Sequence, residues 1–551
     1  MEQDLTPFRR SPDEVMRLAR MGSFHKSRLS FMPTLLRQLV HERWQFDRSA
    51  WEIDATGEGY AVYRARGPQR TYSLVAFAHN LPDEMRSDRV IATAWDATFA
   101  LFDGEPSAQD VARLRANVPR QEAGRISDSE LTLARANRSV RLWAHVVDSL
   151  AAGRQPEREQ LESVGYLMRT TAVYGSGKFG AADRAAIADR PEFRGPFRAE
   201  MLTVWLIRAF TVDLVEHAAR VKGGAHAVTM EPALRRHLGV GNSTGLGMAP
   251  FLLNHPTLIN NWVAAREEAL ARVRSLEIAQ AGALVEFSRL LEEARVNALN
   301  WHTEHAIQVE KVHKLNADLE WLDAHLKTGA LEQPYPWDRL YRWATRSLSL
   351  EGQEQMVSLL IDAHGELVDD LAATMNADEQ GSFRIDGRMS VGCLLNTLAS
   401  QYGWVRGIDF GRQEARARFW YVSEEKLEPR LGQRQCDPGA ELEQPLGVAF
   451  DVSQMWRGLE QWDRQSHLAE YLLAHPEHRH TARRVQIVRS HPFAEIRDNL
   501  TSAEMLPIDL LRCKLAFFGA TKFDPRSDRW VRINMYADAP YPHEISAPLQ
   551  A

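Results

Sequence analysis

The run GYAVYRAR (59–66) alternates in the manner of a β-strand, and after the turn GPQ (67–69) the chain returns through RTYSLVAFAH (70–79). This alternation has the two-residue period of a β-strand, and a short turn between two such runs predicts an antiparallel hairpin. The segments around Trp44 and over 89–102 are also rich in β-branched and aromatic residues. The sequence therefore predicts an antiparallel β-meander over 44–103.

Beyond Ser127 the apolar residues recur with the 3.6-residue period of helices. The tetrapeptide 127–130 (SDSE) fits a capping box, in which a serine and a glutamate satisfy each other's backbone donors. It predicts a helix to about Gly153. Further helices are expected over 156–174, 197–221, 257–326 with a break near Gly282, and 351–375. We therefore expect 127–375 to be almost wholly helical.

The segment after residue 375 has mixed character, with helical periodicity over 390–401 and 456–473 and strand-like runs over 415–422 and 530–535. The expected fold class is mainly α: a long-helix bundle with an N-terminal antiparallel β-meander and a C-terminal α+β region. Three units are expected, namely an N-terminal β-containing unit (1–125), a helical bundle (126–375) and a C-terminal α+β unit (376–551).

Composition narrows the classes of function. The net charge is −6, from 67 basic and 73 acidic residues, whereas nucleic-acid binders usually carry a basic excess. The three cysteines are far apart, which argues against a disulfide framework. No signal peptide is apparent, and the most apolar stretch, 201–215, contains Arg208 and Asp213. We expect a cytoplasmic protein that binds neither membrane nor nucleic acid.

A first candidate site is the glycine-rich segment 174–180 (YGSGKFG). Closely spaced glycines allow backbone N–H groups to converge on an anion. Tyr174 and Lys178 are candidate proton-transfer residues, and Ser176 is a candidate substrate ligand. The spacing is not that of a Walker A loop. The alternative is a glycine-terminated helix followed by a flexible link.

A second candidate is 239–247 (GVGNSTGLG), which precedes the helix expected from Pro256. Ser243 is a candidate catalytic residue, and Asn242 and Thr244 are candidate substrate ligands. A helix that follows such a loop offers free N–H groups to an anion. The alternative is a long surface loop without a binding role.

Two arginines are further candidates for binding an anionic substrate. Arg208 interrupts an apolar helix, so its guanidinium needs a partner, either a carboxylate such as Asp213 or Glu216 or a substrate anion. Arg138 is expected on a helix face with Asn137, Arg141 and His145, a set that also fits an ordinary solvated stripe.

Histidines occur in two groups, 302–313 and 475–480 (HPEHRH), neither with a known metal-ligand spacing. A polar helix face and an exposed turn explain them, so no metal site is predicted. No cofactor is indicated by the sequence.

The expected long-helix bundle with a polar glycine-rich loop resembles the fumarase–aspartase lyases in outline, which implies elimination chemistry. Their Met-Pro followed by Lys-x-Asn is not reproduced, since Met248-Ala249-Pro250 has no lysine at that place. The function predicted is that of an enzyme, a lyase or a transferase, acting on a small carboxylated or phosphorylated metabolite and compatible with a homo-oligomer. The alternative is a non-catalytic helical scaffold or regulator.

Overall fold

The computed structural model describes most of the chain. The described residues are 5–82, 94–119, 127–170, 187, 189–245, 255–301, 303, 306–375, 384–410, 418–422, 427–431, 442–445, 448–496, 507–520, 522–525 and 530–546. The chain divides into two compact units, each assembled from separate segments. The helical unit comprises 1–30, 245–518 and 525–529, and the sheet unit comprises 31–244, 519–524 and 530–551.

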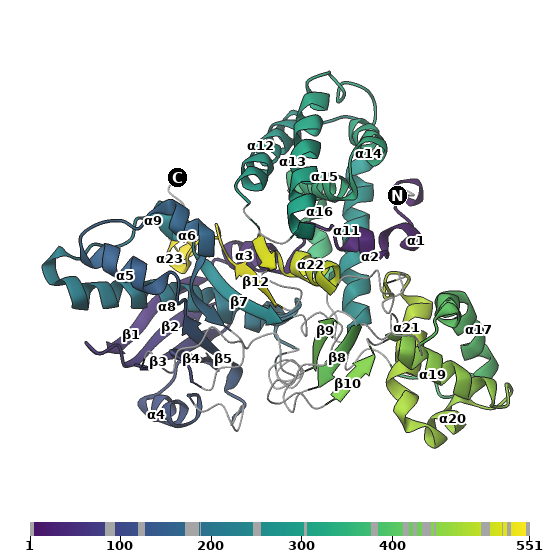
Figure 1. Ribbon diagram of the computed structural model, residues 1–551, viewed down its shortest axis with the longest axis horizontal. Coiled ribbons are helices and arrows are strands. Elements are labelled where there is room, and N and C mark those ends of the chain that lie inside the picture. Colours follow the sequence, from purple (N-terminus) through teal and green to yellow (C-terminus); the bar gives the residue numbers. More distant parts are fainter. Residues whose placement is uncertain are drawn as a thin grey trace. The chain divides into compact units, whose positions relative to one another are not determined.

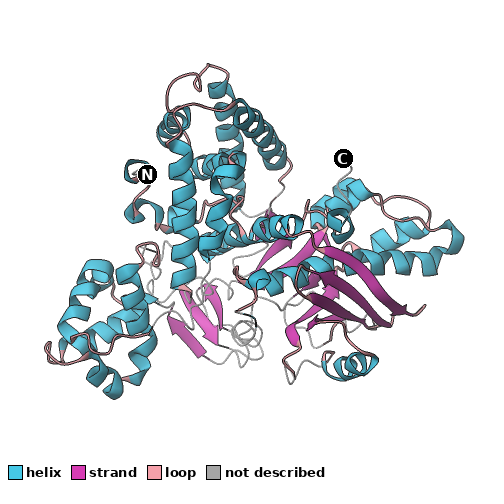
Figure 2. Ribbon diagram, turned by 180° about the vertical axis from the view of Figure 1, so that it is seen from behind, coloured by secondary structure: helices cyan, strands magenta, loops and turns pink. Residues whose placement is uncertain are grey.

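The sheet unit is built on a nine-stranded mixed sheet with the strand order β1-β2-β3-β4-β5-β6-β7-β12-β11. Neighbours from β1 to β6 are antiparallel, and β6 pairs with β7 in parallel. Figures 1 and 2 show β1–β5 side by side as one sheet. The strands are β1 (Gln45–Ile53), β2 (Gly59–Arg66), β3 (Thr71–Ala78), β4 (Ala97–Asp103), β5 (Glu130–Arg138), β6 (Tyr166–Thr170), β7 (Gly239–Gly245), β11 (Lys522–Pro525) and β12 (Trp530–Met535).

Helices cover both faces of this sheet, and the side chains of β4 show how. Phe99 packs edge-on against Phe210 of α8 (Arg198–Gly223), with ring centroids 5.4 Å apart. Phe102 points to the opposite face and shares a buried cluster with Leu114 of α4 (Ala108–Asn117). Successive residues of a strand point to opposite faces of the sheet. The strands of a sheet that is buried on both faces therefore have nearly continuous apolar sequences. The other helices of this unit are α3 (Phe31–His41), α5 (Trp143–Ala151), α6 (Arg158–Val164), α9 (Pro232–Arg236) and α23 (Pro542–Ser546).

The helical unit packs long helices around α11 (Pro256–Arg274) and α15 (Leu350–Ala363). Its other helices are α1 (Pro12–Val15), α2 (Leu18–Met21), α12 (Ala281–Leu299), α13 (Ala306–Leu326), α14 (Pro336–Ser347), α16 (Gly365–Val368), α17 (Val391–Tyr402), α19 (Val448–Glu460), α20 (Leu468–Ala474), α21 (Arg479–Ser490) and α22 (Pro507–Phe518). A small antiparallel sheet has the order β10-β8-β9, formed by Leu442–Pro445, Arg418–Val422 and Leu427–Leu431.

A buried ionic network joins the N-terminal segment to this helical core. Glu354 of α15 is fully buried and pairs with Arg266 of α11 at 2.8 Å, with Arg20 at 2.8 Å and with Arg10. Arg10 also donates to Glu267 at 2.8 and 2.6 Å. Charged side chains can be buried when oppositely charged groups and hydrogen bonds compensate for their lost hydration. This network therefore explains how residues 5–20 are attached to the helical core.

The expected fold class, a mainly α long-helix bundle with a small N-terminal meander, is wrong. The predicted strands at 45–53, 59–66 and 71–78 are present, but they are only the beginning of a sheet that also takes strands from the middle and the end of the chain. Residues 127–170 contain β5 and β6 instead of two long helices. The outline resemblance to the fumarase–aspartase lyases loses its basis with this correction.

The error at Ser127 has a local cause. Ser127 Oγ donates to the Glu130 carboxylate at 3.0 Å, which is a bond between side chains and not the pair of backbone bonds of a capping box, and the turn here leads into β5. Glu130 is fully buried and pairs with Arg113 of α4. The same tetrapeptide can thus precede a helix or a strand, and here tertiary pairing with β4 and β6 decides. In contrast, the helix predicted over 197–221 is confirmed as α8 (Arg198–Gly223), and the helix predicted to start at Pro256 is confirmed as α11.

The predicted glycine-rich loop at 239–247 is also corrected, because Gly239–Gly245 form strand β7. A Cβ atom on Gly239 would lie 2.0 Å from Asn534 Oδ1, and one on Gly241 would lie 2.5 Å from the ring of Tyr166. Both contacts are far closer than atoms can approach without displacement. These glycines are explained by close packing within the sheet.

Candidate functional site

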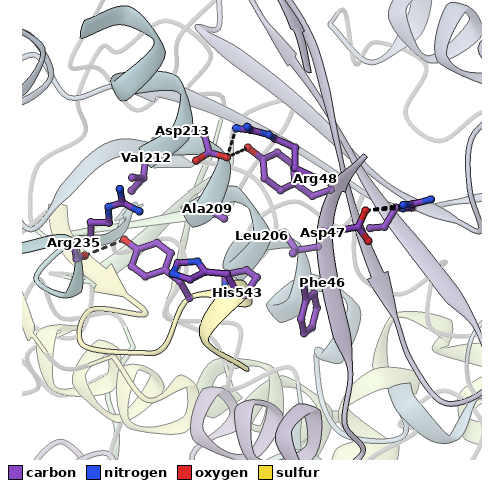
Figure 3. A pocket seen from close by; sticks show the side chains of 13 residues that line it. Phe46, Asp47, Arg48, Leu206, Ala209, Val212, Asp213, Arg235 and His543 are labelled. Atoms are coloured by element: carbon purple, nitrogen blue, oxygen red, sulfur yellow. Dashed lines mark hydrogen bonds and ion pairs between the residues drawn. The ribbon is translucent and has the colours of Figure 1, made fainter. Parts of the chain in front are cut away.

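A pocket with a volume of about 140 Å³ opens in the sheet unit between β1, β2, α8, α9 and the segment that begins α23 (Figure 3). Its lining combines charged side chains with an apolar and aromatic wall. The lining residues are Phe46, Asp47, Arg48, Tyr63, Arg64, Leu206, Ala209, Val212, Asp213, Arg235, Tyr541, Pro542 and His543.

The edge of the sheet positions one wall of this pocket. β1 is the terminal strand of the nine-stranded order, and its pairing with β2 shifts register between Arg48 and Ala50. Such a bulge re-aims side chains and is common beside functional sites. The bulge comes directly after Phe46, Asp47 and Arg48, which pair in regular register with β2 and all line the pocket.

Asp213 of α8 joins this wall to the helix. Its Oδ2 atom accepts the hydroxyl of Tyr63 at 2.6 Å and Nη1 of Arg48 at 2.9 Å. Burial, and then the carboxylate of Asp213, raise the pKa of Tyr63 well above its usual range. The Tyr63 hydroxyl therefore stays protonated near neutral pH, where it acts as a hydrogen-bond donor.

The opposite wall is held by contacts among α8, α9 and the C-terminal segment. Arg235 donates to Glu216 of α8 at 2.7 Å, and its backbone carbonyl accepts the hydroxyl of Tyr541 at 2.9 Å. The rings of Tyr541 and His543 stack with centroids 6.0 Å apart. His543 is exposed, and its imidazole has two ring nitrogens that can donate or accept hydrogen bonds.

The lining supplies three guanidinium groups and one imidazole against two carboxylates. Each arginine has at least one carboxylate partner, since Arg64 is paired with Asp47 at 2.7 Å, Arg48 with Asp213 at 2.9 Å and Arg235 with Glu216 at 2.7 Å, and each guanidinium carries five N–H donors. This arrangement can hold a small anion beside an apolar group that contacts Phe46, Leu206 or Val212.

The residues predicted from sequence are not gathered at this pocket. Tyr174, Ser176 and Lys178 lie outside the described residues. Asn242, Ser243 and Thr244 belong to β7, where Asn242 pairs with Thr170 of β6, and only their backbone is described. Their predicted roles in binding and catalysis stay predictions.

Arg138 ends strand β5 and does not lie on a helix face. Its backbone N–H donates to Oδ2 of the buried Asp96 at 2.9 Å, its Nε lies 3.7 Å from Asp96 Oδ1, and its guanidinium lies 4.6 Å from the Trp143 ring centroid. Asn137, its neighbour, accepts the backbone N–H of Asp96 at 2.9 Å. Arg138 thus helps to fix the strand ends at this side of the sheet.

Arg208 makes neither of the ion pairs considered from the sequence. Its guanidinium donates to the backbone carbonyls of Leu238 at 2.6 Å and Ala539 at 2.7 Å, while Asp213 and Glu216 pair with Arg48 and Arg235. A substrate contact by Arg208 stays a prediction. The bonds that it makes hold the C-terminal segment against α8, an arrangement that we call the Arg208 clamp.

Comparisons with protein-family models, with curated proteins and with solved structures gave no match. Among the helices of the described residues, none has the length and apolar character that a membrane span requires.

Sequence reasoning missed Arg48, Arg235 and His543 as site residues. They lie in three separate segments that only the fold brings together. One signal was available, because Asp213 is a carboxylate within the apolar run 210–215 of α8 and needs a charged partner.

Proposed function

We propose that the protein is an enzyme that binds a small carboxylated or phosphorylated molecule in the pocket lined by Arg48, Asp213 and His543. The observation that carries the proposal is the excess of cationic and hydrogen-bond-donating side chains over carboxylates in the lining. Arginine holds carboxylate and phosphate with two parallel hydrogen bonds, which gives both affinity and orientation.

The size of the pocket restricts the ligand. A volume of about 140 Å³ is well below the ~300–1,000 Å³ of typical ligand sites, so a metabolite with only a few heavy atoms fits better than a nucleotide. Its apolar part would contact Leu206 and Val212, and its anionic group would face Arg48.

Proton transfer in this pocket is assigned to His543, and the Tyr63 hydroxyl, which donates to Asp213 at 2.6 Å, is assigned the positioning of that carboxylate. An elimination and a group transfer both need a base and a group that stabilises negative charge, so lyase and transferase remain the two reaction classes. We place this reaction in the cytoplasm, in line with the widely spaced cysteines of the chain.

The test is a thermal-shift screen of the full chain against small carboxylates and inorganic phosphate. A ligand that binds only the native state raises the melting temperature. Arg48→Gln should abolish the shift, because it removes a half-exposed guanidinium at the pocket. The matched control is Arg158→Gln, which removes an exposed arginine of the same unit that does not line the pocket.

Two outcomes would count against the proposal. If no carboxylate or phosphate raises the melting temperature, the pocket does not bind anions. If the shift survives in both Arg48→Gln and His543→Ala, a ligand binds elsewhere on the chain.

A second candidate function, the non-catalytic scaffold or regulator, is favoured by one observation. Val285, Val296 and Leu299 of α12 are 71%, 45% and 62% exposed. At 100° per residue they fall on one stripe of the helix, and exposed apolar stripes are typical of partner-binding helices. Size-exclusion chromatography of Val285→Ser/Leu299→Ser beside the wild type tests whether this stripe mediates assembly, including the predicted homo-oligomer.

A further inference from the structure

The turn between α20 and α21 carries a compact group of histidine and glutamate side chains. His475 ends α20, and its backbone N–H donates to the Tyr471 carbonyl at 2.8 Å. The 3₁₀ turn Pro476–His478 follows, with Pro476 at its first position. A 3₁₀ helix has three residues per turn, so side chains at i and i+3 lie above one another. This backbone places His475 and His478 on the same side.

Three potential metal ligands converge there. His475 Nδ1 lies 3.3 Å from Glu477 Oε1, and His478 Nε2 lies 3.9 Å from the same oxygen. One ligand atom from each of the three residues lies within 4.8 Å of the others. A tetrahedral zinc site with bonds of about 2.0–2.1 Å separates its ligand atoms by roughly 3.4 Å. The His475–Glu477 pair already has this spacing, while His478 lies 3.9 Å from Glu477 and the two imidazole ligand atoms lie within 4.8 Å of each other, so these two pairs must close slightly on a bound metal.

Neighbouring aromatic rings hold both imidazoles in place. The ring of Tyr471 lies 4.8 Å from that of His475, and 5.8 Å from that of His478 at an interplanar angle of 5°. Tyr471 is fully buried, and its hydroxyl donates to the Met455 carbonyl at 3.3 Å. Trp462 packs edge-on against His475 with centroids 6.0 Å apart. Ligands that are already ordered lose little conformational entropy when a metal binds.

We propose that His475, Glu477 and His478 form a binding site for a divalent transition-metal ion of the zinc class. Two imidazoles and one carboxylate suit zinc and its neighbours, whereas calcium and magnesium prefer sites made of oxygen ligands. Three protein ligands leave at least one coordination position open to water or to a ligand. The proposal replaces the prediction from sequence spacing that the chain binds no metal. It is independent of the pocket in the sheet unit.

The competing explanation is an ordinary His–Glu ion pair in an exposed turn. Isothermal titration of chelator-treated, full-length protein with ZnCl₂ separates the two. We expect one saturable site, and we expect at least a tenfold loss of affinity in His478→Ala, His475→Ala and Glu477→Gln. The Glu477 side chain is 61% exposed, so Glu477→Gln reports on metal binding with little effect on folding. Co²⁺ added in place of Zn²⁺ should give the visible absorption of a low-coordinate site.

His480 supplies the matched control. It is exposed and near in sequence but does not belong to the group of three ligands. His480→Ala should bind Zn²⁺ as the wild type does. Absence of saturable binding to the wild type, or equal losses in His480→Ala and His478→Ala, would overturn the proposal.

Discussion

The guanidinium carbon of Arg208 lies 3.8 Å from the ring centroid of Tyr541, while its nitrogens donate to the backbone carbonyls of Leu238 and Ala539. Arg208 is 1% exposed, and burial lowers its pKa from the usual range. A desolvated cation is stabilised here by carbonyl dipoles and by the face of an aromatic ring. This one side chain therefore links the C-terminal segment 536–546 to α8 and to Leu238, the residue before β7.

Arg208→Met should destabilise the protein. It removes the donors to the buried Leu238 carbonyl and the partly buried Ala539 carbonyl, at about 1–3 kcal/mol each, so we expect a loss of ~3 kcal/mol in the free energy of unfolding. Urea unfolding followed by tryptophan fluorescence measures it, with the exposed Arg220→Met on the same helix as control. A variant as stable as the wild type would contradict the clamp and favour the predicted role of Arg208 in substrate binding.

Gly241→Ala should destabilise the sheet unit by about 1–3 kcal/mol, the usual cost of overpacking. The added Cβ atom would meet the Tyr166 ring at 2.5 Å. The double variant Tyr166→Ala/Gly241→Ala should show a coupling energy, because the second substitution removes the clash. Strictly additive effects in the denaturation curves would argue against this packing explanation.

Lowering the pH should reduce the free energy of unfolding of the helical unit, because Glu354 becomes protonated. Burial alone would raise the pKa of Glu354, but the ion pairs with Arg10, Arg266 and Arg20 outweigh burial and lower it to about 2. The folded-state pKa lies below the unfolded value, so this stabilisation is fully present above pH ~4.5 and is lost as the pH falls towards 2.

Glu354→Gln tests this acid dependence by circular dichroism across the pH range. The variant should be less stable at pH 7, on the order of 3–5 kcal/mol, because Arg10 and Arg266 lose a buried counter-charge. The free energy of unfolding of the variant should also fall less steeply than that of the wild type as the pH drops below about 4.5. The control is Glu320→Gln at an exposed position of α13, whose stability should depend on pH as that of the wild type does. If the stability of Glu354→Gln falls with acid as steeply as that of the wild type, other carboxylates cause the acid sensitivity.

Cys513 should be unreactive in the native protein. It is fully buried in α22, and burial raises the pKa of its thiol far above the usual range, so the nucleophilic thiolate is not formed near neutral pH. Alkylation with iodoacetamide followed by peptide mass spectrometry should label the half-exposed Cys393 first and Cys513 only after denaturation. Fast native labelling of Cys513 would show that this helix opens readily.

Local sequence patterns determined the elements that depend on near neighbours alone. The first hairpins follow from two-residue alternation around short turns, and α8 and α11 follow from long apolar periodicity with Pro256 at the start of α11. Asp213 could be recognised as a charge that needs a partner, because a carboxylate in an apolar helix is costly unless it is paired.

The tertiary structure decided the rest. Glu130–Arg138 carries helix-compatible residues but becomes a strand because β4 and β6 offer backbone partners on both sides. Gly239–Gly245 reads as a loop but pairs as β7, since only glycine fits against Asn534 and Tyr166. The pocket joins Arg48, Asp213 and His543 from strand, helix and C-terminal segment. Contacts between residues so distant in sequence depend on chain topology, which periodicity and local propensity do not encode.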